Sequence, residues 1–214
     1  MWKINLKPEQ KIWFTSDTHY NHANICRGTT KWTGNLDMHT RNFKSLRDMN
    51  NQIVHNLNFM VAQDDILIHL GDWSLGGFDS IREFRERIHC KNIYLVLGNH
   101  DHHIEDNKDN IRDLFVDVVH YTRLEVIDGD DKYEFVLSHF PIASWHGMNK
   151  SVMHLFGHVH LPHGKKIMPG KSMDIGVDGF KIFPYSLFQV VHSLKMRPNK
   201  TTLIPSDHHE TEIR

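Results

Sequence analysis

Short apolar runs recur along the first half of the chain, and longer stretches with helical periodicity separate them. The runs at 12–15, 66–70 and 93–97 predict three strands. Between the first two runs, apolar residues from Phe43 to Leu57 recur every three or four positions, which indicates an amphipathic helix. Asp79 is a candidate N-cap for a second helix before the third strand. This alternation predicts parallel strands joined by right-handed crossovers.

The second half of the chain predicts more strands and fewer helices. The strands are expected at 124–127, 133–137, 152–156 and 173–176. The first two flank Asp128-Gly129-Asp130-Asp131, a sequence typical of a hairpin turn. Ser186 is a candidate cap for a last short element, strand or helix, that runs through Leu194. We therefore expect an α/β fold, a four-layer α/β/β/α sandwich of two mixed sheets flanked by helices.

One domain is expected over residues 1–196, followed by a polar, aperiodic tail at 197–214. A polar stretch from Tyr20 to Arg41 is too long for an ordinary connection, which suggests a functional loop. The formal net charge of -1 gives no general attraction to nucleic acid or to a membrane surface. No apolar run is long enough to span a bilayer, and residues 1–10 lack an apolar signal core. With only Cys26 and Cys90, a cytoplasmic protein with reduced thiols is expected.

Metal-binding side chains follow five of the predicted strands. They are Asp17 and His19 after the first, Asp72 after the second, Asn99 after the third, His139 after the run at 133–137, and His158 and His160 after the run at 152–156. Ligands at the carboxyl ends of strands gather at one edge of an α/β sheet, where such folds build their sites. Mixed Asp, His and Asn ligation suits Mn, Fe, Zn or Ni, and a carboxylate can bridge two cations. A two-metal site is therefore expected.

The order of these motifs resembles the calcineurin-like metallophosphoesterases, and in particular their small bacterial and phage members. The matching motifs are Asp17-x-His19, Gly71-Asp72, Gly98-Asn99-His100-Asp101, His139 and Gly157-His158-Val159-His160, spread over residues from about 11 to 190. The resemblance implies a hydrolase with two divalent metal ions, manganese foremost, that attacks phosphate esters with a hydroxide bridging the metals.

The resemblance also implies a role for each residue. The first metal would be held by Asp17, His19 and His160, the second by Asn99, His139 and His158, and Asp72 would bridge them. His100 would lie beside the leaving group and stabilise or protonate it. Asp101 would orient His100.

Several further side chains are candidates for substrate contact. They are His22, Arg27, Trp145 and His146. The alternative for each is an ordinary loop residue that makes no contact with the substrate. His69 and His154 lie inside apolar runs, which favours buried structural imidazoles for both.

One departure from the family pattern bears on the substrate. Protein phosphatases of this family carry arginines just after the Gly-Asp motif and a glutamate after Asn-His, whereas here Trp73-Ser74 follows Asp72 and Asp101 replaces the glutamate. A phosphomonoester dianion loses a bidentate clamp without that arginine, unless Arg27 or Lys165 supplies one. We therefore expect a phosphodiesterase acting on a small phosphate ester or a nucleotide.

Three alternatives remain open at this point. The protein is a phosphomonoesterase, a metal-dependent nuclease, or a non-catalytic scaffold of the same fold. A nucleic-acid substrate gains no support from the charge, and the sequence leaves the oligomeric state open. A closed structural metal site is disfavoured because such a site needs only four ligands, whereas seven are predicted here.

Overall fold

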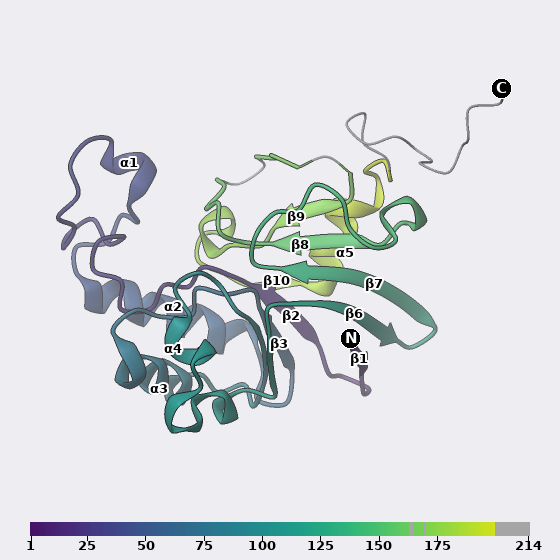
Figure 1. The fold of residues 1–214 in the computed structure, drawn as a ribbon, viewed down its shortest axis with the longest axis horizontal. Coiled ribbons are helices and arrows are strands. Elements are labelled where there is room, and N and C mark those ends of the chain that lie inside the picture. The colour runs from purple at the N-terminus through teal and green to yellow at the C-terminus, as the bar shows by residue number, and fades with distance from the viewer. Residues whose placement is uncertain (163–164, 169, 200–214) are drawn as a thin grey trace.

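Two five-stranded sheets pack face to face in the computed structural model, which describes residues 1–162, 165–168 and 170–199 (Figure 1). The strand order is β10-β2-β3-β4-β5 in one sheet and β1-β6-β7-β8-β9 in the other. Both sheets are mixed, and helices flank them. The predicted α/β sandwich of two mixed sheets is therefore confirmed.

The first sheet holds the strands of the alternating half. It contains β2 (Ile12–Thr15), β3 (Ile66–His69), β4 (Asn92–Val96) and β5 (Asp117–Val119), all parallel, with β10 (Tyr185–Ser186) antiparallel to β2. Every residue of β2 and β3 is buried, as expected for parallel strands covered on both faces. The carboxyl ends of β2, β3 and β4 consequently point to one edge.

The second sheet is built around the predicted hairpin. It contains β1 (Trp2–Asn5), β6 (Tyr121–Asp128), β7 (Asp131–Ser138), β8 (Met153–Phe156) and β9 (Ser172–Asp174). Asp128 pairs with Asp131 across the hairpin turn, as predicted. β7, β8 and β9 are parallel, so β7 and β8 end side by side.

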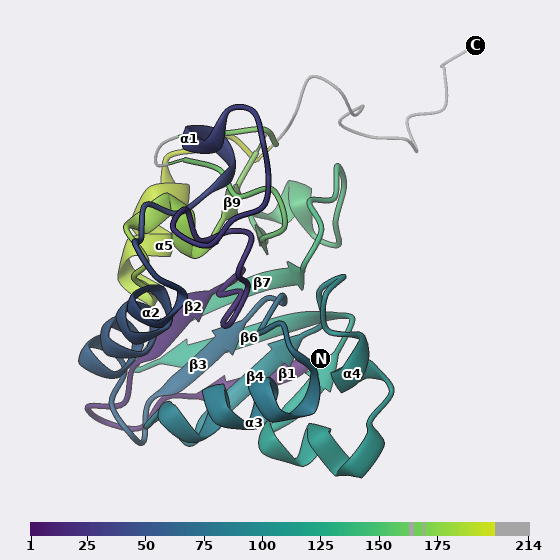
Figure 2. The ribbon, with the colours of Figure 1, turned by 90° about the vertical axis from the view of Figure 1, so that its left-hand side faces the viewer.

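The helices are shared unequally between the two sheets. Figure 2 shows α2 (Leu46–Met60) and α3 (Gly77–Arg87) lying across the first sheet, and both contribute to a large apolar core on that side. Helix α5 (Leu187–Lys195) begins at Ser186, which caps it as expected, and its apolar face joins the core between the sheets. The outer face of the second sheet carries a small cluster instead, around Trp145.

Shorter elements complete the described chain. They are α1 (Leu36–His39), α4 (His102–Glu105) and the 3-10 helices η1 (Lys108–Leu114), η2 (Met148–Lys150) and η3 (Val177–Phe180). Helix α1 lies within the long polar stretch that the sequence singles out. Of the predicted tail, Arg197 donates a hydrogen bond to the carbonyl of Ser172 in β9, and residues 200–214 lie outside the described residues.

One predicted helix start is wrong. Helix α3 begins at Gly77, and its N-cap is Gly76 with a left-handed backbone (φ 107°). Asp79 lies in the first turn, where its charge favours the positive end of the helix dipole without capping it. The glycine pair Gly76-Gly77 is the signal that locates this boundary, because both residues adopt positive φ.

Candidate metal centre

Five strand ends from the two sheets bring the predicted ligands together. Their side chains form two groups in which the ligand atoms lie within 4.8 Å of one another, namely Asp17, His19 and His160, and Asp72, His139 and His158. Asn99 adjoins the second group: its Oδ1 lies 3.0 Å from Nε2 of His139 and 2.9 Å from Nδ1 of His158. The structure thus gathers all seven predicted ligands at one place.

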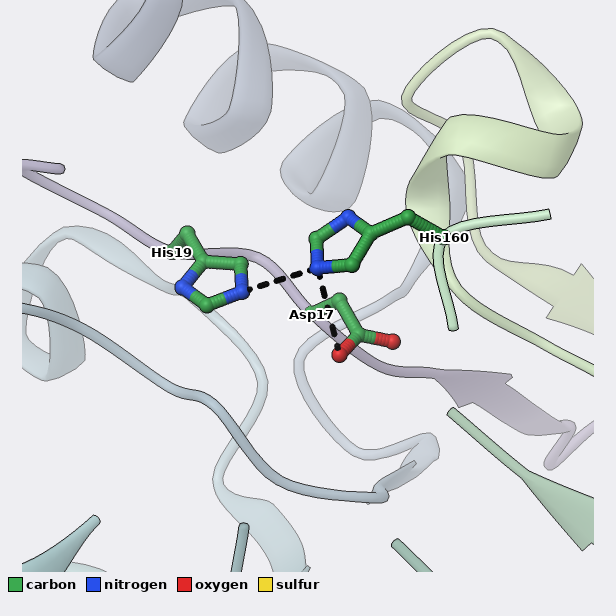
Figure 3. Close-up of side chains that lie close together, drawn as sticks. All are labelled: Asp17, His19 and His160. Atoms are coloured by element: carbon green, nitrogen blue, oxygen red, sulfur yellow. Dashed lines mark hydrogen bonds and ion pairs between the residues drawn. The ribbon is translucent and has the colours of Figure 1, made fainter. Parts of the chain in front are cut away.

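The first group points its polar atoms inward (Figure 3). Nε2 of His19 lies 3.2 Å from Nε2 of His160, which in turn lies 3.9 Å from Oδ1 of Asp17. The Asp17 carboxylate also accepts the backbone N–H of His158, so it touches the loop that carries both late histidines. Two imidazole nitrogens and a carboxylate oxygen thus face one another, and a cation between them would bind to all three.

Burial leaves the Asp17 carboxylate in need of a counter-charge. The side chain is fully buried, and desolvation raises its pKa to about 8, which the neighbouring carboxylates of Asp174 and Asp72 reinforce. Burial also lowers the pKa of His19 well below its usual value, so this imidazole is neutral and able to donate a lone pair. The residues therefore fit a divalent cation, which would hold Asp17 ionised.

Asp72 stands between the two groups. Its Oδ2 lies 3.4 Å from Nε2 of His19 and 3.5 Å from Nε2 of His139. Its other oxygen, Oδ1, accepts the backbone N–H of His100 at 2.9 Å. One carboxylate oxygen within reach of a ligand from each group is the geometry that a bridging role requires.

The backbone is strained at most of the predicted ligands. The residues with positive φ include Asp17 (56°), His19 (47°), Asp72 (56°), His158 (72°) and His160 (50°). A left-handed conformation is uncommon for residues other than glycine, and such strain concentrates at functional sites. The turns after β2, β3 and β8 thus carry a cost that extended strand ends would avoid.

Partners behind the imidazoles determine which nitrogen faces inward. Nδ1 of His139 lies 2.7 Å from the carbonyl oxygen of Leu70, which only accepts, so Nδ1 carries the proton and Nε2 is free to bind. Nδ1 of His160 lies 2.6 Å from Oδ2 of Asp178, which has the same effect. A carboxylate or carbonyl behind a metal-binding histidine is the usual arrangement for orienting the ring.

Asp178 and its partner Arg41 are functional candidates that sequence reasoning did not single out. Arg41 is buried and pairs with both oxygens of Asp178, at 2.8 and 3.0 Å. Burial opposes ionisation of Asp178, but Arg41 and His160 outweigh it and hold its pKa well below the usual range. Asp178 lies in the short helix η3, and no local pattern in the sequence marks Arg41 as its partner.

Asp101 does not serve His100 as predicted. Its carboxylate accepts the backbone N–H groups of Asp72, Trp73 and Gly98, at 2.8–2.9 Å. It therefore joins the turns after β3 and β4, the two strands that carry Asp72 and Asn99. Asp101 is buried, which raises its pKa to about 7 despite those hydrogen bonds.

His100 and His22 lie together beside the first group. The exposed His100 ring has its centroid 5.3 Å from that of His19, and the His22 ring lies 5.2 Å from His19 and 6.1 Å from His100. Beyond His22, 5.9 Å away, is the partly exposed ring of Trp32. His22 thus lies close to the first ligand group, and its contact with substrate stays a prediction.

The structure uses the other substrate candidates differently. The guanidinium of Arg27 bonds Thr40 and the carbonyl of Leu36 and pairs with Asp37, so it holds the polar loop together. Trp145 is buried against Met148 and Val152, and its indole N–H donates to the Val152 carbonyl. Only His146 of this loop pair is exposed. Trp145 is therefore a core residue and not a wall of the metal centre.

His69 and His154 are buried, as expected of structural imidazoles. Nε2 of His69 lies 2.9 Å from the Thr18 hydroxyl, and Nδ1 accepts the backbone N–H of Gly71. Nδ1 of His154 lies 3.1 Å from the Val136 carbonyl, and its Nε2 accepts the N–H of Ile142. Burial lowers the pKa of His69 to about 3 and that of His154 to about 4, so both remain neutral.

Known proteins are similar to this chain in sequence and in fold. The chain is 29% identical over 188 residues to an uncharacterized protein of Methanocaldococcus jannaschii, covering 85% of this chain and 90% of that protein. It is 27% identical over 192 residues to the gene 66 protein of Mycobacterium phage D29, covering 79% and 88%. A protein of unknown function from Aquifex aeolicus superposes with a TM-score of 0.62 at 22% identity, over 86% of this chain and all of that one, which shows a shared fold.

Among the described residues, no helix has both the length and the apolar character needed to cross a bilayer. The sequence model of the calcineurin-like phosphoesterases matches residues 10–165, a span that takes in β2, β3, β4, β7 and β8 and every predicted ligand. Proteins of this family typically bind two divalent metals, and the two ligand groups match that number. The chain belongs to the calcineurin-like phosphoesterase family.

Proposed function

We propose that the chain hydrolyses phosphodiesters of the nucleotide type, with Asp17, His19 and His160 holding one divalent cation and Asn99, His139 and His158 the other. The observation that carries this proposal is the position of Asp72, whose Oδ2 reaches a histidine of each group at 3.4 and 3.5 Å. Metal ions held by these residues would supply the positive charge that activates water and stabilises phosphoryl oxygens. Manganese suits this donor set best, with Fe, Zn and Ni as alternatives.

The protein's own contribution is to hold these ligands before the metals arrive. His139 and His160 each have the far nitrogen fixed by an acceptor, which leaves Nε2 directed inward. Asp101 ties the turns of Asp72 and Asn99 to each other through three backbone N–H groups. The site is therefore organised by the strand-end turns and not by flexible side chains alone.

His100 is assigned to the leaving group. Its backbone N–H is fixed by Oδ1 of Asp72, while its imidazole is exposed beside His19. A side chain anchored at its backbone and open at its ring can donate a proton to a departing oxygen. His22 lies next to His100 and is assigned to the same side of the substrate.

The charge pattern favours a diester over a monoester. The two arginines of the polar loop are both engaged, Arg27 with Asp37 and Arg41 with Asp178. Neither supplies the guanidinium fork that a phosphomonoester dianion favours. A diester carries one negative charge fewer at its phosphate and so depends less on such a clamp.

Two exposed aromatic rings favour substrates that carry bases. Phe140 is 47% exposed and lies against His158, with ring centroids 4.6 Å apart, while Trp32 lies near His22 on the other side. Nucleobases stack on exposed aromatic side chains. Nucleotide diesters therefore fit better than small alkyl phosphates.

The buried free thiols Cys26 and Cys90 suit a reducing compartment such as the cytoplasm.

A substrate panel tests the proposal. Protein loaded with manganese is assayed on bis-p-nitrophenyl phosphate, p-nitrophenyl phosphate, cyclic nucleotides and a short oligonucleotide. The expected result is a higher kcat/KM on the diester reporter and on cyclic nucleotides than on the monoester or the oligonucleotide. Preference for the monoester would assign the chain to the phosphatases instead, and preference for the oligonucleotide would assign it to the nucleases.

A further inference from the structure

Arg41 joins the polar loop to the metal centre from behind. It is 5% exposed and lies where the loop closes on itself, since its backbone N–H donates to the Ile25 carbonyl and its own carbonyl accepts from Arg27. The segment between these contacts carries Trp32 and helix α1 (Figure 2). Arg41 therefore anchors a loop segment that includes Trp32, whose ring lies 5.9 Å from that of His22 beside the first ligand group.

The guanidinium of Arg41 contacts the first ligand group at two points. One nitrogen donates to the Thr18 carbonyl at 2.7 Å and another to the Asp17 carbonyl at 2.5 Å, so it holds the strained turn that carries Asp17 and His19. The same guanidinium makes a bidentate pair with Asp178.

Asp178 passes this contact on to the third ligand of the group. It belongs to η3, and its Oδ2 lies 2.6 Å from Nδ1 of His160. The chain of contacts from Arg41 through Asp178 to His160 spans 137 positions of sequence at its first step. All three predicted ligands of the first group are thus reached from one side chain, two of them through their own backbone turn.

We infer that Arg41 and Asp178 are positioning residues for the first metal, and that they couple occupation of that site to the order of the loop at 20–41. This inference rests on the ligands assigned under the proposed function. A cation that binds only when Asp17 and His160 are correctly placed must stabilise the contacts that place them, and reciprocity makes the docked loop strengthen metal binding.

The second group is supported by other residues. Asp101 holds the turns that carry Asp72 and Asn99, His139 is held by a backbone carbonyl, and His158 has Asn99 at its Nδ1. The side-chain hydrogen bonds described for Arg41 and Asp178 go to each other and to the first group and its turn. Removing the Arg41–Asp178 pair is therefore expected to weaken one metal site selectively. A pair that served stability alone would affect both sites equally.

Manganese titration of the full-length chain tests this inference by calorimetry. Arg41→Lys keeps the charge but cannot reach two carbonyls and a carboxylate together, and Asp178→Asn keeps an acceptor for His160 but loses the charge that Arg41 pairs with. Each is expected to weaken one of two sites by about 10- to 100-fold, the usual cost of losing a partner behind a ligand, with the other site changed less than about threefold.

Arg85→Lys is the matched control. Arg85 is also partly buried, and its guanidinium donates to the carbonyls of Leu114, Ile88 and Lys91, none of which belongs to a turn that carries a predicted ligand. Its replacement should leave both affinities unchanged. An equal loss in Arg85→Lys, or an equal loss at both sites in the Arg41 and Asp178 variants, would overturn the inference.

Hydrogen exchange supplies a readout that does not depend on activity. Manganese is expected to slow amide exchange in peptides covering 20–41 of the wild type, and this protection should disappear in Arg41→Lys but persist in Arg85→Lys. A wild type that binds fewer than two manganese ions would refute the proposed function itself. Two normal sites in Arg41→Lys, with metal-dependent protection intact, would refute only the coupling.

Discussion

His158 and His160 stand two residues apart on the same turn, yet the fold supports them differently. Both have a left-handed backbone and both face ligand atoms of other strands. Behind His160 lie Asp178 and Arg41, which fix its far nitrogen and its charge. Beside His158 lies the ring of Phe140, which limits its movement but forms no charged contact.

The difference teaches that similar ligands need not make equivalent sites. If Asp72 is counted for both groups, the first has a second carboxylate, that of the buried Asp17, and a histidine backed by the carboxylate of Asp178, while the second has the neutral, exposed Asn99 instead. More negative charge and better-fixed ligands favour tighter metal binding. We expect the first site to fill first, and the second to remain the more open to substrate.

The largest effect is expected at Asp72, the one carboxylate that lies within reach of both ligand groups. Asp72→Asn keeps the shape but removes the charge that both sites use, and hydrolysis at limiting manganese should be abolished. Activity assays across a manganese titration measure this. Full activity at limiting metal would show that neither site depends on Asp72.

His100→Gln should cost about 10²- to 10⁴-fold in kcat while both metals stay bound, because general acid help is worth that much. The loss should be large for nucleoside leaving groups and small for nitrophenolate, which departs without a proton. Steady-state kinetics on both ester types give the ratio. An equal loss on both would leave His100 an electrostatic role only, and loss of a metal would make it a ligand.

Replacing the two histidines of the shared turn separately tests the comparison itself. His160→Ala should weaken the tighter manganese site, and His158→Ala the weaker one. Each affinity should fall by about 10-fold or more, because losing only a hydrogen-bond partner behind a ligand already costs about that much. Calorimetry resolves the two steps. The same step lost in both variants would mean that the two groups form one site.

Trp32→Ala should raise KM for nucleotide diesters by about fivefold or more, since stacking one base is worth about 1–3 kcal/mol. KM for methyl p-nitrophenyl phosphate should change little. Phe188→Ala on α5 is the control, because that ring is likewise exposed but lies on another element. A uniform change across substrates would remove Trp32 from base recognition.

A separate effect, outside the metal centre, concerns stability and pH. His154 has a pKa near 4 when folded and an ordinary value of 6.5 when unfolded, so the unfolded chain binds the proton first and stability falls as pH drops below 6.5. Its share of this loss is about 2 kcal/mol between pH 7 and pH 5. His154→Gln lacks the titration, so urea unfolding in EDTA should show the gap between variant and wild type narrowing by that amount. A gap independent of pH would place a charged His154 in the core.

The strand ends and their ligands could be predicted because both signals are local. An apolar run followed at once by Asp, His or Asn needs no knowledge of distant contacts, and β2, β3, β4, β7 and β8 all match. β1, β5 and β10 were missed because their sequences, Trp-Lys-Ile-Asn, Asp-Val-Val and Tyr-Ser, contain no apolar run of four residues. All three are edge strands, which need no such run because one of their sides has no neighbouring strand.

The contacts that support the predicted ligands could not be predicted, because most of them join residues that lie far apart in the sequence. Arg41 meets Asp178 at a separation of 137 positions and the Asp17 backbone at 24, and no sequence motif marks Arg41 itself. Asp101 was assigned by its neighbour in sequence, His100, whereas its hydrogen bonds go to turns on two different strands. Adjacency in sequence is a poor guide to which side chain a carboxylate serves at a strand end.

The left-handed turns at Asp17, His19, Asp72, His158 and His160 set two selective pressures against each other. Glycine would relieve the backbone at any of these positions, by roughly 1 kcal/mol or more for each. It would also delete a ligand. Selection for thermal stability alone would favour glycine at these positions, so aspartate and histidine at all five are what we expect if the proposed metal binding is itself selected.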